Sequence, residues 1–390
     1  MGAPKVLLVT NQDWAHYTHR LPVARALRDA GFEAVFVSAP GPYAPLLEEA
    51  GFRFIPWQLD RRSLNPVREV RPLVELTRIY QMERPEAVFH FTIKPILHGA
   101  LAARAAGVPA VVNLFTGLGF PFLDFGPSRY YKPMLASLLR RLLRGNRSFT
   151  VFHNEEDRQS LITQKVVTQA RSRTIFSSGV DIDRFAPQTS GPQHNVPVAL
   201  MAARLLWDKG IQEYVDAAQQ VRARGVPARF LVAGSPDLGS TLAVDEIQVT
   251  KWHDEGVVEF LGHRDDMPAL LRDADVAVLP SYHEGVPRFL LESAAAGLPV
   301  IATNVPGCRV VVDAGVNGLL VPPRDSAALA DALVAMLSDT ELRERMGKAS
   351  REIAVERFSQ SEAMDAHLDV LRHLGVRTER PTGGDSLPSR

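Results

Sequence analysis

The chain has 390 residues, of which 46% are hydrophobic and 23% charged, and its 44 Lys and Arg balance 44 Asp and Glu. That length predicts two domains, and the zero net charge excludes the global attraction to nucleic acid that a basic protein has. The single cysteine, Cys308, excludes an internal disulfide and fits a reducing cytosol. No apolar stretch approaches the ~18 residues that a membrane-spanning helix needs.

In the first half, short β-rich runs alternate with amphipathic helices, which is typical of parallel sheets wound with helices. The clearest helices are expected at 20–30 and 96–106, because Gly31 and Gly107 follow them as terminating residues. Strands are expected at 5–10, 34–38, 87–91, 110–114, 150–153 and 173–176.

The second half repeats this alternation after the segment 185–197, whose Pro, Gln, Ser and Gly residues predict a linker. Strands are expected at 198–202, 229–233, 257–260, 276–279, 300–303 and 318–321, and helices at 211–224, 326–337 and 360–374. We therefore expect an α/β chain of two doubly wound parallel-sheet domains, 1–184 and 198–357, facing across a cleft. The helix 358–375 is expected to pack back on the first domain, and 376–390 to form a disordered tail.

Glu284 and Glu292 are the most informative residues of the chain. Glu284 follows the strand 276–279, and Glu292 lies about two helical turns further on, on nearly the same side. Open α/β sheets bind ligands at that edge, where a carboxylate can accept hydrogen bonds from sugar hydroxyls and a helix start can bind phosphate. Two ordinary acidic residues at a helix start are the alternative interpretation.

Arg204 and Lys209 flank the loop that follows the strand 198–202 and precedes a helix. An arginine that binds bidentately and a lysine that acts as a point charge can together hold a diphosphate. Taken alone, two solvated surface cations would be the commoner arrangement.

Together these segments resemble the signature of retaining glycosyltransferases of family 4, which have the GT-B fold of two Rossmann-like domains. The resemblance implies that Arg204 and Lys209 hold the nucleotide diphosphate, that Glu284 contacts the transferred sugar, and that Glu292 contacts the ribose. It assigns catalysis to Glu284, Lys209 and Arg204. It adds these donor-binding positions: Gly262, His263, Arg264, Gly285, Val286 and Pro287.

Two acidic segments, 265–266 and 181–183, look like metal-binding motifs. Asp266 is better explained as a helix N-cap with Pro268 in the first turn, and 181–183 lies on the approach to the hinge between GT-B domains. We expect no metal, because cations and helix N-termini can stabilise a leaving diphosphate. We also expect no cofactor beyond the nucleotide sugar donor.

Motifs in the first half narrow the resemblance to a branch of family 4 that builds bacterial surface polysaccharides and lipid-linked oligosaccharides. They are Asp13-Trp14, His19-Arg20, 92–95 and 116–119. Histidine, arginine and lysine near strand ends suit a pyrophosphate, and a glycine-rich turn lets the backbone approach a sugar closely. The candidate acceptor-binding residues are His19, Arg20, His90, Lys94, Thr116, Gly117 and Gly119. A purely structural role stays open for the first four, above all for His90.

Residues 130–147 form a basic, leucine-rich amphipathic segment. Such a helix can dock on anionic lipid, but a helix that buries its leucine face in the domain has the same spacing. Both interpretations stay open. We expect a cytoplasmic protein, peripheral on the inner face of the cytoplasmic membrane if this helix docks.

These features predict transfer of a hexose or N-acetylhexosamine from a UDP-linked donor to a lipid-linked or polysaccharide-precursor acceptor. Two alternatives are a GT-B nucleotide-sugar epimerase and a non-catalytic nucleotide-sugar-binding protein. The pair Glu284 and Glu292 argues against an epimerase, and no G-x-G-x-x-G follows the first strand to suggest a dehydrogenase.

Overall fold

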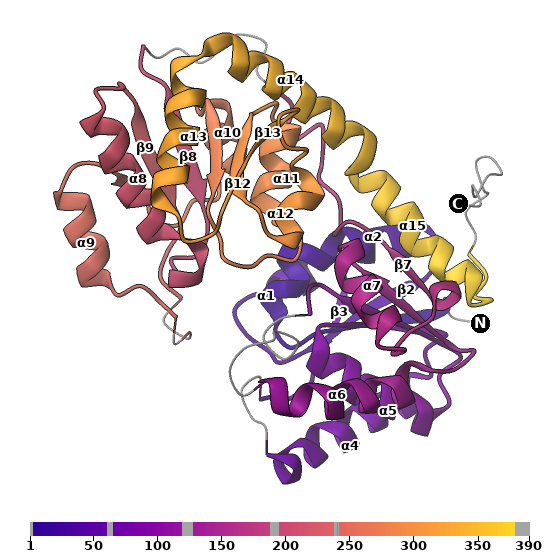
Figure 1. The fold of residues 1–390 in the computed structure, drawn as a ribbon. Helices are drawn as coiled ribbons and strands as arrows, with labels where there is room; N and C mark the ends of the chain where they lie inside the picture. The colour runs from indigo at the N-terminus through magenta and orange to yellow at the C-terminus, as the bar shows by residue number, and fades with distance from the viewer. Residues whose placement is uncertain are drawn as a thin grey trace. The chain divides into compact units, whose positions relative to one another are not determined.

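The computed structural model describes residues 3–60, 65–118, 128–187, 195–237, 240 and 242–378, with the backbone alone at 66 and 128–132. The chain divides into two compact units (Figure 1). The first comprises Met1–Ser178 and Ser361–Arg390, and the second comprises Gly179–Gln360. Parts of the expected linker (188–194) and of the expected tail (379–390) lie outside the described residues.

The first unit is built on a seven-stranded parallel sheet in the order β3-β2-β1-β4-β5-β6-β7. Its central strands are apolar runs that are buried on both faces, as parallel strands covered by helices require. The strands are β1 Lys5–Val9, β2 Glu33–Ser38, β3 Arg53–Pro56, β4 Ala87–Phe91, β5 Ala110–Phe115, β6 Ser148–Phe152 and β7 Ser172–Thr174.

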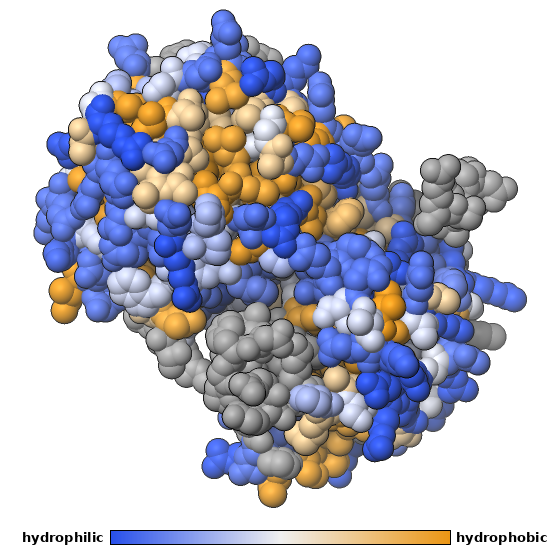
Figure 2. Space-filling view, in the orientation of Figure 1, coloured by the Kyte–Doolittle hydropathy of each residue, from blue (hydrophilic) through white to orange (hydrophobic). Residues whose placement is uncertain are grey.

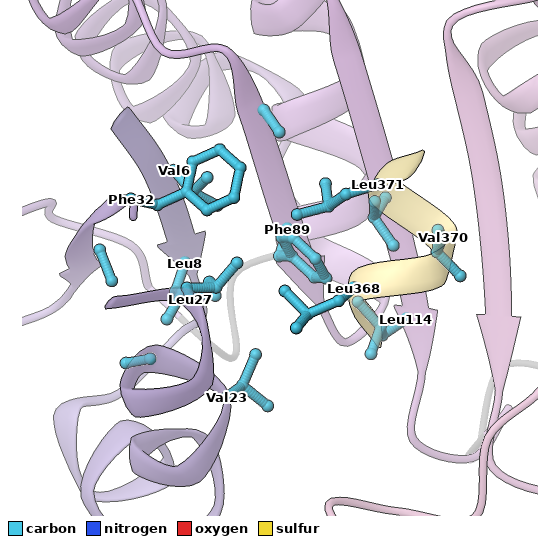
Figure 3. Packing of buried hydrophobic residues seen from close by; sticks show 14 of the residues in the cluster. Val6, Leu8, Val23, Leu27, Phe32, Phe89, Leu114, Leu368, Val370 and Leu371 are labelled. Atoms are coloured by element: carbon cyan, nitrogen blue, oxygen red, sulfur yellow. The ribbon is translucent and has the colours of Figure 1, made fainter. Parts of the chain in front are cut away.

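Helices cover both faces of this sheet. On one face, α2 (Leu21–Asp29) and α15 (Gln360–His373) pack on β1 and β4. Figure 3 shows Leu368 and Leu371 of α15 beside Phe89 of β4. The other face carries α4 (Pro66–Glu83), α5 (Ile93–Ala106) and α6 (Ser128–Leu143). In the described part of this unit the chain also forms α3 Ala44–Glu49, α7 Glu155–Thr163 and the π-helix His16–Arg20.

The second unit contains a six-stranded parallel sheet in the order β10-β9-β8-β11-β12-β13. Its strands are β8 Val198–Ala202, β9 Arg229–Ala233, β10 Glu259–Phe260, β11 Val276–Leu279, β12 Val300–Thr303 and β13 Gly318–Val321. One face is covered by α8 (Ile211–Ala223), α9 (Glu246–Asp254) and α13 (Ser326–Ser338). The other helices are α10 Met267–Arg272, α11 Arg288–Ala295, α12 Pro306–Val311 and α14 Thr340–Arg357. The two sheets thus have the architecture expected of a GT-B protein.

The unit boundary lies earlier than the expected residue 184. Val180 donates its N–H to the Phe358 carbonyl (2.8 Å) and accepts from the N–H of Gln360 (3.0 Å). Arg351 also donates to the Ile182 carbonyl (2.8 Å). These contacts hold the segment after Ser178 in the second unit, and loop composition alone does not reveal such backbone pairing.

His90, expected to contact an acceptor, is a core residue of the first unit. Its side chain is fully buried, with Nε2 at 2.9 Å from the Tyr80 hydroxyl and Nδ1 at 2.9 Å from Asn113 Oδ1. A Cβ at Gly99 would lie 2.3 Å from Nε2, so the His90 ring packs directly against the backbone of Gly99 and could not do so against any larger residue. Since both nitrogens are bonded inside the core, the structure favours the structural role that the sequence left open for His90 over a contact with the acceptor.

Burial lowers the pKa of His90 to about 4, and it lowers those of His16 to about 3 and His367 to about 4. The ordinary value of 6.5 is the one expected for the unfolded chain. Between pH 6.5 and about 4, the unfolded chain therefore binds protons that the native first unit does not, and stability falls as the pH falls.

Replacing His90 with glutamine should flatten this acid dependence, because a shift from 6.5 to about 4 corresponds to roughly 3 kcal/mol. The measurement is urea unfolding from pH 7 to 4, followed by pulsed hydrogen exchange on peptides that span β4 and β5. His263→Gln, at an exposed histidine of the second unit, should leave the slope unchanged. An unchanged slope in His90→Gln would show that His90 titrates normally.

Candidate active site

In the second unit, four residues singled out in the sequence map to one edge of the sheet. β8 and β11 are neighbours, but the chain leaves β8 toward β9 and leaves β11 toward β12 on the opposite side. Such a topological switch point is where open α/β sheets bind ligands. Arg204 and Lys209 follow β8, while Glu284 follows β11 and Glu292 lies on the next helix, α11.

Lys209 and Glu284 form an ion pair across this switch point. Lys209 Nζ donates to Glu284 Oε1 at 2.6 Å, and each side chain is only 14% exposed. A charge-assisted bond in such partial shelter is stronger than a surface pair. The pair joins the loop after β8 to the loop after β11.

Gly210 lets the Lys209 loop approach the end of β11, and Gly307 lets α12 approach the Glu284 loop. Gly210 has a φ of +73°, and a Cβ there would lie 2.1 Å from the Pro280 carbonyl oxygen. At Gly307, at the start of α12, a Cβ would lie 2.1 Å from the Gly285 oxygen and 2.5 Å from the Glu284 oxygen. Any side chain at either position would push one of the loops away.

The second unit also has a cavity of about 480 Å³ that carries Arg204 and Glu292 on its wall. This volume lies within the range of small-molecule sites. Its lining residues are Ala202, Ala203, Arg204, Ala233, Gly234, Ser235, Pro236, Asp237, His263, Arg264, Met267, Arg288, Phe289 and Glu292. Lys209 and Glu284 pair with each other outside this described lining.

Glu292 is the buried acid of the cavity. Burial raises the pKa of Glu292, and the neighbouring Arg288, whose Nε donates to the carboxylate from the previous helical turn, opposes this rise. Hydrogen-bond donors from a ligand would stabilise this desolvated carboxylate further.

Arg204 is half-exposed at the cavity wall, where it pairs with Asp237 at 2.7 Å. Asp237 was not among the predicted site residues, and neither were the wall residues Met267, Arg288 and Phe289. The spacing of Arg288, four residues before Glu292 on one helix, was a usable signal for its ion pair. No comparable pattern marked the others.

The loop 262–266 contributes His263 and Arg264 to the same cavity. His263 pairs with Asp265 at 3.1 Å, and Arg264 pairs with Asp266. Asp266 stands at the N-cap of α10, with Pro268 in the first turn, but its side chain makes no capping bond. Gly262 adopts a left-handed φ of +67° at the start of this loop.

The carboxylates of the two acidic segments interact with neighbouring groups of the protein itself. Asp181 Oδ1 accepts from the N–H groups of Asp183 (3.2 Å) and Arg184 (2.9 Å), as in a turn. Asp265 and Asp266 are engaged by His263 and Arg264. Within the described ranges, no group of three or more His, Cys, Asp or Glu is placed to hold a metal ion.

In the first unit, the cations expected to meet an acceptor are engaged by their neighbours. Arg20 is buried, with its guanidinium 4.3 Å above the Phe91 ring and a bond to the Ser178 hydroxyl. Lys94 donates to Glu69 (2.8 Å) and to the Asp60 carbonyl (2.7 Å). His19 is half-buried and stands edge-on to a tryptophan ring.

The glycine-rich turn follows β5 as expected. Thr116 is half-buried, and Gly117 has a φ of +144°, which suits glycine. Leu118 donates its N–H to Asp157 at 3.2 Å, which ties the turn to α7. Gly119 lies outside the described residues.

Asp13, part of a motif quoted for the family branch, has a structural role. Its carboxylate accepts from the N–H groups of Trp14, Tyr43 and Ala44, and thereby fixes the start of α3. The presence of Asp13 is therefore explained by its hydrogen bonds to a backbone turn, and no ligand is needed to account for it.

Two family models match the chain, one in each unit. Residues 5–154 match a model described as "Glycosyl transferase 4-like", and residues 183–353 match one described as "Glycosyl transferases group 1". The second match contains Arg204, Lys209, Glu284 and Glu292.

Curated relatives are similar over most of the chain. A Campylobacter jejuni N,N'-diacetylbacillosaminyl-diphospho-undecaprenol alpha-1,3-N-acetylgalactosaminyltransferase is 26% identical over 87% of this chain and 91% of its own. An Escherichia coli UDP-Gal:alpha-D-GlcNAc-diphosphoundecaprenol alpha-1,3-galactosyltransferase is 26% identical over 79% and 81%. These matches favour a transferase over the epimerase and the non-catalytic binding protein.

Solved structures share the fold. Anabaena HepE, solved in complex with UDP and glucose, superposes with a TM-score of 0.77 at 20% identity, covering 95% of this chain and 99% of HepE. A Rickettsia africae glycosyltransferase gives a TM-score of 0.75 at 19% identity, covering 96% and 99%. With a GT4-like first unit, a group 1 second unit and this shared architecture, the chain belongs to the glycosyltransferases of the GT-B type.

Proposed function

We propose that this chain is a retaining, metal-independent member of family 4. It transfers a hexose or N-acetylhexosamine from a UDP-linked donor to a lipid-linked or polysaccharide-precursor acceptor in the synthesis of bacterial surface glycans. The observation that carries this proposal is the Lys209–Glu284 ion pair at the switch point of the second sheet. It puts a cation for the leaving phosphate and an acceptor for sugar hydroxyls side by side.

The donor occupies the second unit in this proposal. Its diphosphate meets Arg204 and Lys209, its ribose donates hydroxyl bonds to Glu292, and its base lies along the cavity wall near His263 and Arg264. A diphosphate carries more negative charge than one carboxylate, so it draws the ammonium of Lys209 away from Glu284. The carboxylate of Glu284 is then available to the hydroxyls of the sugar.

Catalysis in this scheme is mainly electrostatic. Negative charge develops on the departing diphosphate in the transition state, and Arg204 and Lys209 stabilise it there. The leaving phosphate helps to deprotonate the acceptor hydroxyl on the same face of the sugar, so no side-chain nucleophile is required. The names of two relatives specify α-1,3 linkages, which retention from an α-linked nucleotide sugar produces.

The acceptor is assigned to the first unit, with His19 and the turn at Thr116 and Gly117 as its polar contacts. The relatives named above act on diphospho-undecaprenol acceptors, which are held in membranes. No helix within the described ranges has both the length and the hydropathy of a membrane span. Contact with lipid would therefore be made from the surface.

The helical face α4-α5-α6 supplies a candidate surface for this contact. On α6, Met134 is 71% and Leu138 is 42% exposed, and basic residues follow from 140 to 147. On α4, Val67, Val70 and Val74 are 80%, 56% and 43% exposed. Figure 2 shows hydrophobic side chains among hydrophilic ones at the end of the first unit where α4 lies. Neither α5 nor α6 contains an acidic residue, whereas α4 balances three arginines with three glutamates. The positive charge for anionic headgroups therefore comes from the α6 side of this face, and α4 contributes exposed apolar side chains.

Replacing Lys209 with alanine, or Glu284 with glutamine, should lower kcat about 100-fold or more. The first change removes a cation that stabilises the charge on the departing diphosphate, and the second removes the carboxylate that holds the sugar in the transition state. The assay measures UDP release with an undecaprenyl-diphosphate-linked saccharide as acceptor, with and without EDTA, and NMR of the product reports the anomeric configuration. Lys251→Ala, at an exposed lysine on α9, is the matched control. Near-normal turnover in both variants would contradict the assigned roles, inversion would contradict retention, and EDTA inhibition would contradict metal independence.

If Glu292 binds the ribose, its contribution to UDP binding should depend on the ribose hydroxyls. UDP should raise the thermal midpoint of the wild-type protein, by mass action on the folded state, more than UDP lacking the 2′- or the 3′-hydroxyl does. In Glu292→Gln this preference should shrink, which a double-mutant cycle over protein and ligand measures. The same preference in both proteins would remove Glu292 from the ribose site. The same measurement with ADP and GDP in place of UDP tests which base the site prefers.

The exposed valines of α4 allow a direct test of membrane contact, because their side chains are not needed for the core. Val67, Val70 and Val74 replaced together with serine should weaken binding to phosphatidylglycerol vesicles about 10-fold or more. Salt should weaken the wild-type binding. The control replaces Val316 and Val355, two exposed valines of the second unit, with serine. Absence of wild-type binding in vesicle co-sedimentation would end the proposal of membrane docking.

A further inference from the structure

Tyr282 stands two residues before Glu284 and contacts three different segments of the second unit. Its N–H donates to the Asp208 carbonyl at 2.8 Å. Its hydroxyl donates to Glu213 Oε1 at 2.6 Å, and its ring lies 4.6 Å from the guanidinium carbon of Arg324. Neither the spacing of this tyrosine nor its neighbours form a motif, so it could not be selected from the sequence alone.

These contacts bind the loop of Glu284 to the segment of Lys209. Asp208 directly precedes Lys209, and Glu213 lies in the first turn of α8. Tyr282 therefore joins the Glu284 loop to the Lys209 segment through its N–H and to the first turn of α8 through its hydroxyl, and neither bond involves Lys209 or Glu284. The two connections are independent of each other.

The hydroxyl of Tyr282 is a stable donor. Burial and the bond to the Glu213 carboxylate raise the pKa of Tyr282 well above its ordinary value, so the phenol keeps its proton at physiological pH. On the other side of the ring, Arg324 adopts a left-handed φ of +61°, which is unfavourable for a residue other than glycine. Its contact with the ring is a cation–π interaction.

The two connections respond differently to the donor. In the proposed function, the diphosphate draws Lys209 away from Glu284, which removes the ion pair just when the position of Glu284 matters. The bonds of Tyr282 to Asp208 and Glu213 involve no group that the diphosphate would attract. They are what still fixes the Glu284 loop when the donor is bound.

We propose that Tyr282 is a positioning residue that holds the carboxylate of Glu284 against the transferred sugar in the donor complex. The proposal rests on the roles assigned above to Lys209 and Glu284. It identifies a residue that acts through Glu284 and touches neither the sugar nor the diphosphate. Its effect is therefore expected in turnover, and not in the binding of UDP, which lacks the sugar.

Tyr282→Phe removes the hydroxyl and keeps the ring beneath Arg324. It should lower kcat about 10- to 100-fold, as small misplacements of catalytic groups do, while the Kd for UDP changes less than about 2-fold. In a Glu284→Gln background the same change should lower kcat little further, because residues that act through one group are not additive. Steady-state kinetics and calorimetric UDP titration measure these quantities.

Tyr214→Phe is the matched control, because it also removes one buried hydroxyl from the second unit. That hydroxyl donates to the Ala199 carbonyl in the core, at 2.7 Å, away from the Glu284 loop. The control should lower the thermal midpoint and leave kcat unchanged at a temperature where the protein stays folded. It separates general loss of stability from misplacement of Glu284.

Wild-type kcat in Tyr282→Phe would overturn the proposal, and so would a loss of kcat that is fully additive with Glu284→Gln. Both results leave the proposed function intact if Glu284→Gln alone is strongly impaired. Full turnover in Glu284→Gln alone would instead refute the role of Glu284, and the role of Tyr282 would fall with it.

Discussion

The Lys209–Glu284 ion pair exists because two neighbouring strands send the chain in opposite directions. β8 and β11 lie side by side, yet the helices after them belong to connections that run to β9 on one side and β12 on the other. Their loops therefore meet at one point of the sheet edge, the place where α/β folds bind ligands. At this point Lys209 Nζ lies 2.6 Å from Glu284 Oε1. The pair satisfies both charges in the absence of substrate, and a diphosphate can exchange for one partner.

Close approach of backbone makes this arrangement possible. Gly210 and Gly307 each face a carbonyl oxygen at a distance that no Cβ could tolerate, so the Lys209 loop lies against the end of β11 and α12 lies against the Glu284 loop. Tyr282 then fastens the two loops to each other by hydrogen bonds. The charged groups thus sit on segments whose positions are fixed independently of their own attraction. Such preorganisation lets electrostatic stabilisation act without reorganisation during the reaction.

Much of the architecture was predictable, because buried parallel strands are continuous apolar runs that the sequence displays directly. The strands β8, β9, β11, β12 and β13 have the expected bounds. The helices α4 and α14 were not predicted. α4 contains Pro72 and exposes valines on its outer side, which blurs the contrast between its buried and exposed faces. α14 is strongly polar, so neither helix shows one apolar face opposite a polar one. The π-helical turn His16–Arg20 also has no sequence signal, since it depends on tertiary packing.

The structure brings the predicted donor-binding residues of the second unit to one sheet edge, whereas several predicted acceptor-binding residues of the first unit are engaged within that unit, and the reason is physical. In the second unit, Arg204, Lys209, Glu284 and Glu292 pair with side chains at the same edge, so their charge remains exchangeable with a ligand. In the first unit, comparable groups are used in folding: Asp13 fixes α3, His90 lies in the core and Arg20 lies over Phe91. Residue type and strand-end position are the same in both cases. Only burial and partners distinguish them, and these depend on residues such as Asn113 and Ser178, distant in sequence from the groups they hold.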